Sequence, residues 1–168
     1  MTGVRLRAPD ESDREAFLAA ARRSRELHHP WTPAPDTDEA YDRYLSRAAQ
    51  PNQSCLLVVT DDDQLAGVYN LSEIVRGAFQ NAYLGYYAFA PLAGTGLMRA
   101  AMPLVLAHAF DELGLHRLQA NVQPENARSR ALLEATGWRE EGYAPRYLFI
   151  DGAWRDHVLY AVTVEDRS

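Results

Sequence analysis

The spacing of apolar and polar residues predicts a succession of short strands and helices. Strands are predicted where apolar and polar residues alternate or an apolar run is short, and helices where apolar residues recur every three or four positions. The predicted strands are 4–8, 54–60, 65–75, 82–89 and 118–122, and the predicted helices are 10–28, 37–49, 96–113 and 127–135. The tail 147–164 reads as two more strands around Asp151-Gly152, a dipeptide typical of a hairpin turn. The order β-α-α-β-β-β-α-β-α-β-β indicates a mixed α+β fold.

Proline and glycine mark the boundaries of these elements. Pro9 ends the first strand, and the proline-rich stretch 28–36 is predicted to be a loop because proline cannot occupy a helix interior. Gly114 and Gly137 follow the last two helices, where glycine commonly ends a helix. The chain has no repeat, low-complexity tract or linker, so residues 1–168 are predicted to form a single domain.

Charge and composition narrow the classes of partner. The formal net charge of −6 argues against a nucleic-acid partner, which calls for a basic face. No apolar stretch approaches the roughly 18 residues of a membrane span, and the N-terminus lacks the apolar segment of a signal peptide. We therefore expect a cytoplasmic protein without membrane contact. The single cysteine, Cys55, excludes an internal disulfide and is expected to be a buried core thiol, since no histidine or acid pattern beside it suggests a nucleophile.

Histidine and aromatic residues give no metal or nucleophile signature. His28 and His29 are adjacent rather than four apart, and no cluster has metal-ligand spacing, so no metal is predicted. No Ser-His-Asp order stands out, and His108 is expected to pack or lie half-exposed on the long helix. The aromatic residues Trp31, Tyr41 and Tyr44 fit either a peptide groove or core packing.

The segment FAPLAGTGLM, residues 89–98, joins a strand to a helix through Gly94, Thr95 and Gly96. Helix N-termini offer free backbone N–H groups and a positive dipole end, and glycine allows an anion to approach closely. Such a turn can bind a phosphate or pyrophosphate, although a plain tight turn also accounts for an isolated Gly-x-Gly. The Rossmann and Walker A motifs are excluded, because the third glycine and the Gly-Lys-Ser/Thr element are missing.

The context of this turn resembles a known family. The strand AYLGYYAF, then Pro91, AGTGLM and a long helix resemble the coenzyme A site of GNAT-fold N-acetyltransferases, and QPENARSRALLEATGWREEG resembles the second half of that site. The segments NLSEIVRGAFQNAYLGY, GLHR and EGYAPRYLFIDGAWRDHVLYA are similar to the RimJ/RimL group within it. The similarity runs from about residue 65 to the end and is thinner over residues 1–60. It implies a GNAT fold, in which a mixed, mostly antiparallel sheet is splayed at its fourth strand and flanked by helices.

The resemblance also implies which residues bind acetyl-CoA, the co-substrate of the family. They are Tyr87, Ala88, Phe89, Ala90, Ala93, Gly94, Thr95, Gly96, Leu97, Met98 and Asn126. Asn126 also suits the N-cap of the following helix. The chain departs from the family pattern at Ala93, where Arg or Gln is usual, and has Met98 at the last small position. Losing one charged hydrogen bond is worth roughly 1.5–3 kcal/mol, so weaker rather than abolished coenzyme binding is expected.

The catalytic roles follow from the same resemblance. Ser129 matches the residue that protonates the leaving thiolate, and Glu73 is the hypothesis for the general base, with a solvent-exposed strand-end carboxylate as the alternative. Backbone N–H groups around Tyr87 to Phe89 are expected to stabilise the oxyanion. The reaction depends little on a general base, because an α-amine has a pKa of about 7.7–8.0 and is partly neutral at pH 7.

The implied activity is acetyl transfer from acetyl-CoA to a primary amine, first of all the N-terminal α-amine of a ribosomal or other protein or peptide. Two alternatives remain at this stage. The acceptor could be a small amine such as a drug, a polyamine or an amino-acid conjugate, or the chain could be a non-catalytic acyl-CoA-binding module, which the substitution at Ala93 favours. A monomer and a homodimer fit the sequence equally.

Overall fold

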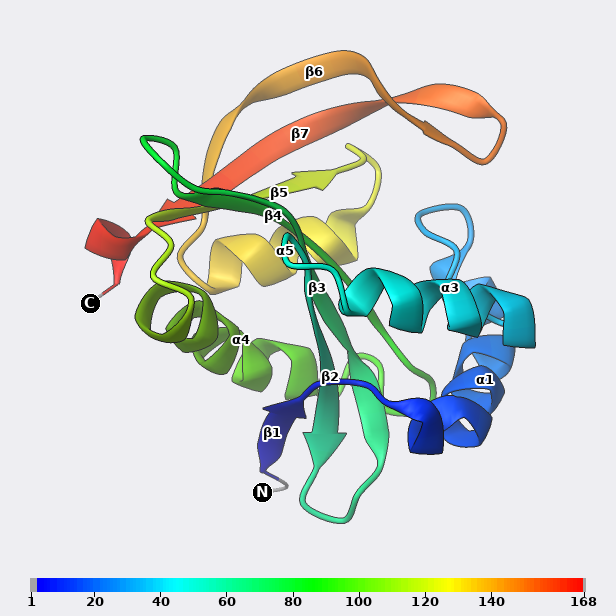
Figure 1. Ribbon diagram of the computed structural model, residues 1–168. Coiled ribbons are helices and arrows are strands. Elements are labelled where there is room, and N and C mark those ends of the chain that lie inside the picture. The colour runs from blue at the N-terminus through cyan, green and yellow to red at the C-terminus, as the bar shows by residue number, and fades with distance from the viewer. Residues whose placement is uncertain (1–2, 168) are drawn as a thin grey trace.

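A computed structural model describes residues 3–167 (Figure 1). It contains seven strands, five α-helices and three short helical segments among these residues. The strands are β1 (Val4–Arg7), β2 (Ser54–Thr60), β3 (Leu65–Val75), β4 (Asn81–Ala88), β5 (Arg117–Val122), β6 (Arg139–Ile150) and β7 (Ala153–Thr163). The helices are α1 (Arg14–Arg23), α2 (Arg25–His28), α3 (Asp38–Ala48), α4 (Leu97–Ala107) and α5 (Ala127–Ala135). The short segments are η1 (Glu11–Asp13), η2 (His108–Glu112) and η3 (Val164–Asp166).

The strands form one sheet in the order β1-β2-β3-β4-β5-β7-β6. All neighbouring pairs are antiparallel except β4 and β5, which are parallel and pair only over Asn81–Tyr83 with Arg117–Gln119. The five remaining residues of β4 stay paired with β3 while β5 turns away. The predicted sheet, mixed, mostly antiparallel and splayed at its fourth strand, is confirmed.

Two apolar cores lie on opposite faces of the sheet. One packs α4 and α5 against the sheet and includes Leu56 and Val58, while the other packs α1 and α3 against β2–β4 and includes Leu57 and Val59. Successive residues of β2 therefore enter different cores, which explains its unbroken apolar run. Figure 1 shows these helix pairs on the two sides of the central strands. Cys55 is a buried free cysteine, as predicted, and burial raises the pKa of its thiol.

The structure corrects three predicted boundaries. The first predicted helix is broken at Ser24, whose buried hydroxyl donates to the Ala20 carbonyl and accepts the Ala90 N–H. The last turn of the long helix is a π-helix over His108–Glu112. β6 starts at Arg139 rather than at 147, because this exposed edge strand carries two bulges and gives no apolar alternation. Within residues 3–167 no helix is long and apolar enough to cross a membrane.

The break at Ser24 generates a prediction about stability. Ser24→Ala removes the acceptor of the Ala90 N–H at a site only 1% exposed, so it is expected to lower the free energy of unfolding by about 1–3 kcal/mol. Urea denaturation followed by circular dichroism measures the change. The control is Ser46→Ala on the exposed side of α3, where a change within about 0.5 kcal/mol is expected. Equal stability of the two variants would show that the Ala90 N–H finds another partner.

Candidate active site

A cleft of about 720 Å³ opens where β4 and β5 separate. Its walls are α2 with the loop to Thr32, the second half of β4, the Leu92–Gly96 loop with the first turn of α4, and α5. Of the predicted coenzyme residues, Tyr87, Ala88, Ala93, Gly94, Gly96, Met98 and Asn126 line the cleft, together with the predicted acid Ser129. The structure thus gathers residues from both halves of the sequence signature around one opening.

The Gly94–Gly96 turn forms one end of the cleft. Gly94 and Gly96 have φ values of 79° and 88°, which glycine adopts without strain. Gly96 is the N-cap of α4, and its carbonyl accepts the first bond, at 2.9 Å from the Ala100 N–H. The N–H groups of residues 97–99 precede that bond and point out of the helix end, as at helix N-termini in general. This end can hold an anion without any side chain.

The side chains of two predicted coenzyme residues, Thr95 and Leu97, do not point into the cleft. Thr95 is not among the lining residues, because its hydroxyl donates to the Leu92 carbonyl at 2.5 Å. The Leu97 side chain packs against the core rather than entering the cleft. Both residues therefore contribute backbone, not side chains, to any contact with a ligand.

Two arginines bring positive charge to the cleft, which the alanine at position 93 does not provide. Arg99, in the first turn of α4, and Arg128, in the first turn of α5, are exposed residues that line the cleft. A guanidinium binds phosphate through paired hydrogen bonds, so either residue can contact an anion at the helix ends. Neither arginine was predicted from the sequence. Their place just inside two helix N-termini is the signal that could have identified them.

The first turn of α4 is fixed closely against β3. The Tyr69 hydroxyl donates to the Met98 carbonyl at 2.9 Å. A Cβ added to Gly67 would lie 2.4 Å from the Met98 sulfur and 2.6 Å from the Tyr87 carbonyl oxygen. Because Gly67 has no side chain, a methionine fits at position 98, where the family pattern has a small residue.

Backbone groups of β4 form the wall of the cleft, but not all of those predicted. The Phe89 N–H donates to the Ala66 carbonyl at 2.8 Å, and the Ala90 N–H donates to Ser24. Neither is free to stabilise an oxyanion, and neither residue lines the cleft. Since N–H groups alternate along a strand, those of Tyr86 and Ala88 face the splay instead. Of the predicted range Tyr87 to Phe89, the Ala88 N–H faces the splay, with the Tyr86 N–H beside it, and an oxyanion role for these groups stays a prediction.

His28 fastens α2 to this wall. Its Nε2 lies 2.7 Å from the Ala88 carbonyl oxygen, and because a carbonyl only accepts, Nε2 carries the proton. Burial lowers the pKa of His28, which favours the neutral ring, and the ring centroid lies 5.1 Å from that of Tyr87. Trp31 also lines the cleft, whereas Tyr41 and Tyr44 are buried in the core.

A tyrosine and a serine meet in the centre of the cleft. The hydroxyls of Tyr86 and Ser129 lie 2.6 Å apart, joining β4 to α5 across the splay. Burial raises the pKa of Tyr86, with the hydrogen bond to Ser129 acting in the opposite direction, so the phenol stays protonated at neutral pH. Asn126 caps α5 by accepting the Ser129 N–H at 3.2 Å through Oδ1, which confirms the predicted cap and leaves the amide nitrogen to contact a ligand. Tyr86 was not predicted.

Glu73 lies apart from this pair. It is exposed at a bulge of β3, has a φ of 49° and does not line the cleft. Tyr69 is paired with Tyr86, and Glu73 lies four residues beyond it, roughly 13 Å along a strand that rises about 3.3 Å per residue. The structure does not bring Glu73 and Ser129 together, and the role of Glu73 as the base stays a prediction.

Among residues 3–167, no group of three or more His, Cys, Asp or Glu side chains is arranged to hold a metal ion.

Known proteins share both this sequence and this fold. The chain is 37% identical over 165 residues to the ribosomal protein uS5-alanine N-acetyltransferase of Escherichia coli strain K12, which covers 92% of this chain and 85% of the relative. The solved structure of Mycobacterium smegmatis RimJ in complex with CoA-disulfide superposes with a TM-score of 0.88 at 31% identity, over 98% of this chain and 83% of that one. The ribosomal-protein-S5-alanine acetyltransferase from Vibrio fischeri superposes with a TM-score of 0.86 at 27% identity, over 100% and 97%.

The family model described as an acetyltransferase (GNAT) domain matches residues 4–139, which include β1 to β5, the Gly94–Gly96 turn and the Tyr86–Ser129 pair. The match begins in the part of the chain where the sequence resemblance was thinnest. The chain belongs to the GNAT acetyltransferase family.

Proposed function

We propose that this protein transfers the acetyl group of acetyl-CoA to the N-terminal α-amine of a protein, with a ribosomal protein as the first acceptor to test. The observation that carries the proposal is the Tyr86–Ser129 hydroxyl pair, set between an open strand edge and an anion-binding helix end. The relative with 37% identity is named for acetylating a ribosomal protein alanine, and a relative with 31% identity was solved with a coenzyme A disulfide. A ribosomal acceptor would place the enzyme in the cytoplasm, as the sequence predicts.

Each part of the cleft suits one part of acetyl-CoA. The Gly94–Gly96 turn, the first N–H groups of α4 and the Arg99 guanidinium suit the pyrophosphate. The free edge of β4 suits the amide groups of the pantetheine arm, because an unpaired strand edge offers alternating donors and acceptors. The Asn126 amide nitrogen is placed to assist from α5. The acetyl thioester then lies toward the Tyr86–Ser129 pair.

The chemistry needs one nucleophile and one proton donor. The neutral α-amine attacks the acetyl carbon, the carbon–sulfur bond breaks, and the Ser129 hydroxyl protonates the departing thiolate. Tyr86 holds the Ser129 oxygen in place and, as a protonated phenol, can return the proton. The ammonium proton of the acceptor leaves to water or to a base. With an α-amine pKa of about 7.7–8.0, against about 10.4 for lysine, an N-terminus offers far more neutral amine at pH 7.

The acceptor is tested with a panel. A peptide that begins with alanine is expected to react with a kcat/KM at least about tenfold above that of spermidine or other small amines, because its α-amine is more often neutral at pH 7. Thiol release from acetyl-CoA measures the rates. The matched control is the same peptide with a blocked N-terminus and an internal lysine. Turnover of small amines alone would assign the chain to another acceptor class.

Ser129→Ala tests the proton donor. The variant is expected to lower kcat by about a hundredfold, in the range for loss of a general acid, while the Kd for acetyl-CoA changes little. Tyr86→Phe keeps the ring but loses the hydroxyl that positions Ser129, so it is expected to show a smaller fall in kcat. Stopped-flow thiol release and calorimetric titration separate the two quantities. Turnover of Ser129→Ala at the wild-type rate would remove Ser129 from the mechanism.

Arg99→Ala tests the origin of the phosphate contact. Removing a charged hydrogen bond worth about 1.5–3 kcal/mol is expected to raise the Kd for acetyl-CoA about ten- to a hundredfold. Ala93→Arg, which introduces the side chain usual in the family, is expected to lower it. The control is Arg43→Ala on α3, which removes the same charge outside the cleft. Equal affinities of Arg99→Ala and Arg43→Ala would mean that Arg99 does not contact the phosphates, which would leave the backbone and Arg128.

A further inference from the structure

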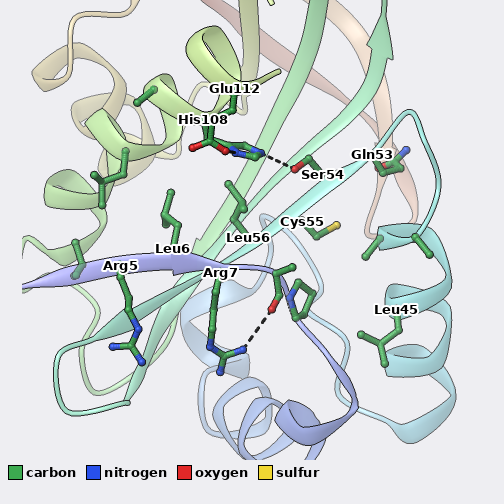
Figure 2. A pocket seen from close by; sticks show the side chains of 17 residues that line it. Arg5, Leu6, Arg7, Leu45, Gln53, Ser54, Cys55, Leu56, His108 and Glu112 are labelled. Carbon is green, nitrogen blue, oxygen red and sulfur yellow. Dashed lines mark hydrogen bonds and ion pairs between the residues drawn. The ribbon is translucent and has the colours of Figure 1, made fainter. Parts of the chain in front are cut away.

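A second cavity, of about 800 Å³, lies between β1, the start of β2, the end of α3 and the second half of α4. It shares no lining residue with the cleft described above. Apolar side chains make up much of its lining, among them Leu6, Leu45, Leu56 and Leu104. Figure 2 shows three polar side chains, those of Ser54, His108 and Glu112, at one end of it.

These three side chains form a continuous hydrogen-bonded chain. The Ser54 hydroxyl oxygen lies 2.8 Å from His108 Nε2, and His108 Nδ1 lies 2.7 Å from a carboxylate oxygen of Glu112. The His108 side chain is 19% exposed, whereas that of Glu112 is 69% exposed. Both contacts lie within the range expected of a serine, its base and the acid that orients the base.

The hydrogen-bond partners of His108 determine which ring nitrogen carries the hydrogen. An ionised carboxylate only accepts hydrogen bonds, so Nδ1 carries the hydrogen toward Glu112. In the neutral form of this tautomer, Nε2 is an acceptor and the Ser54 hydroxyl is its donor. This tautomer is the one that allows a histidine to withdraw a proton from a serine hydroxyl.

Two features of the fold create the arrangement. The π-helical turn over His108–Glu112 places the two side chains, four residues apart, on the side of the helix that faces β2. Single π-helical turns are rare and occur often at functional sites. β1 pairs with β2 only over Leu57–Thr60, so Ser54 lies beyond the end of β1. The edge of β2 from Ser54 to Leu56 is therefore unpaired on the β1 side and lines the cavity.

The two arginines that line the cavity are engaged in ion pairs and do not point toward the end that holds His108. Arg7 is bound to Asp13 and Arg5 to Asp63. In Figure 2 both guanidinium groups point away from His108, and the Cys55 side chain points away from it as well. The groups left around Ser54 are apolar and neutral, which suits an uncharged ligand with a short apolar acyl chain.

We propose that Ser54, His108 and Glu112 form a second catalytic site that hydrolyses short-chain carboxylic esters. The Ser54 oxygen attacks the ester carbonyl carbon as its proton passes to His108 Nε2. The carbon–oxygen bond to the alcohol breaks, and the alcohol leaves with that proton. Water, deprotonated by His108, then attacks the acyl-serine, the carbon–oxygen bond to Ser54 breaks, and His108 returns the proton to the Ser54 oxygen as the carboxylic acid is released. The net reaction consumes one ester and one water, and yields one acid and one alcohol.

Hydrolysis of p-nitrophenyl acetate by the full chain, without acetyl-CoA, tests the proposal. We expect release of p-nitrophenol above the buffer rate, at least a tenfold loss in Ser54→Ala and a clear loss in Glu112→Ala, whose exposed side chain can be removed without disturbing the core. Ser46→Ala is the matched control and should keep the wild-type rate. Ser54→Ala should also keep the acetyl-CoA-dependent activity, because Ser54 does not line the cleft.

A fluorophosphonate probe followed by peptide mass spectrometry gives an independent measurement. We expect a phosphonyl adduct on Ser54 that is lost in Glu112→Ala, whereas a serine that merely ties α4 to β2 would stay unmodified. The proposal is overturned if Ser54→Ala hydrolyses the ester at the wild-type rate, if no Ser54 adduct forms, or if Ser129→Ala alone abolishes hydrolysis.

Discussion

Backbone N–H and C=O groups inside a protein need hydrogen-bond partners, and the separation of β5 from β4 after Tyr83 deprives one strand edge of them. The surroundings of the cleft follow from that constraint. His28 donates to the Ala88 carbonyl, and the Ser24 hydroxyl accepts the Ala90 N–H, so α1 and α2 satisfy the end of the strand. The N–H groups of Tyr86 and Ala88, which face the splay, are left to a ligand. The open edge is thus a constraint on the fold and, in the proposed function, the surface that would bind the pantetheine arm.

Under the proposed binding mode, the Gly94–Gly96 end of the cleft would hold an anion in a protein of negative net charge. The net charge of −6 describes the whole surface, but binding depends on a few groups at short range. Gly94 and Gly96 bring the backbone close, the end of α4 adds its partial positive charge, and Arg99 and Arg128 add full charges from two helices. In this proposed mode, Arg99 and Arg128 would supply the charge that the alanine at position 93 does not.

Sequence reasoning succeeded where the signal is local. Alternating or short apolar runs located the strands of the sheet apart from the first half of β6, and Asn126 was predicted as a helix cap because the cap depends on residues three positions apart. It failed where partners come from distant parts of the chain. Tyr86 and Ser129 are 43 positions apart, and Ser54 and His108 are 54 apart, so neither pair leaves a pattern that can be counted along the sequence. Glu73 shows a related limit, since sequence position near the right strand does not tell that its carboxylate lies at a bulge outside the cleft, and its role as the base stays a prediction.

Helix α4 and its π-helical continuation carry residues of both the cleft and the second cavity. The first turn of α4 faces the cleft at Gly96, Met98 and Arg99, and the π-helical turn that continues it carries His108 into the second cavity. At 1.5 Å per residue, the nine residues from Arg99 to His108 span roughly 14 Å, too far for either site to share an atom with the other. The core residues Ala101, Met102 and Val105 between them are fully buried. The two sites therefore lie at opposite ends of one helix whose middle is buried in the core, which keeps their lining residues separate.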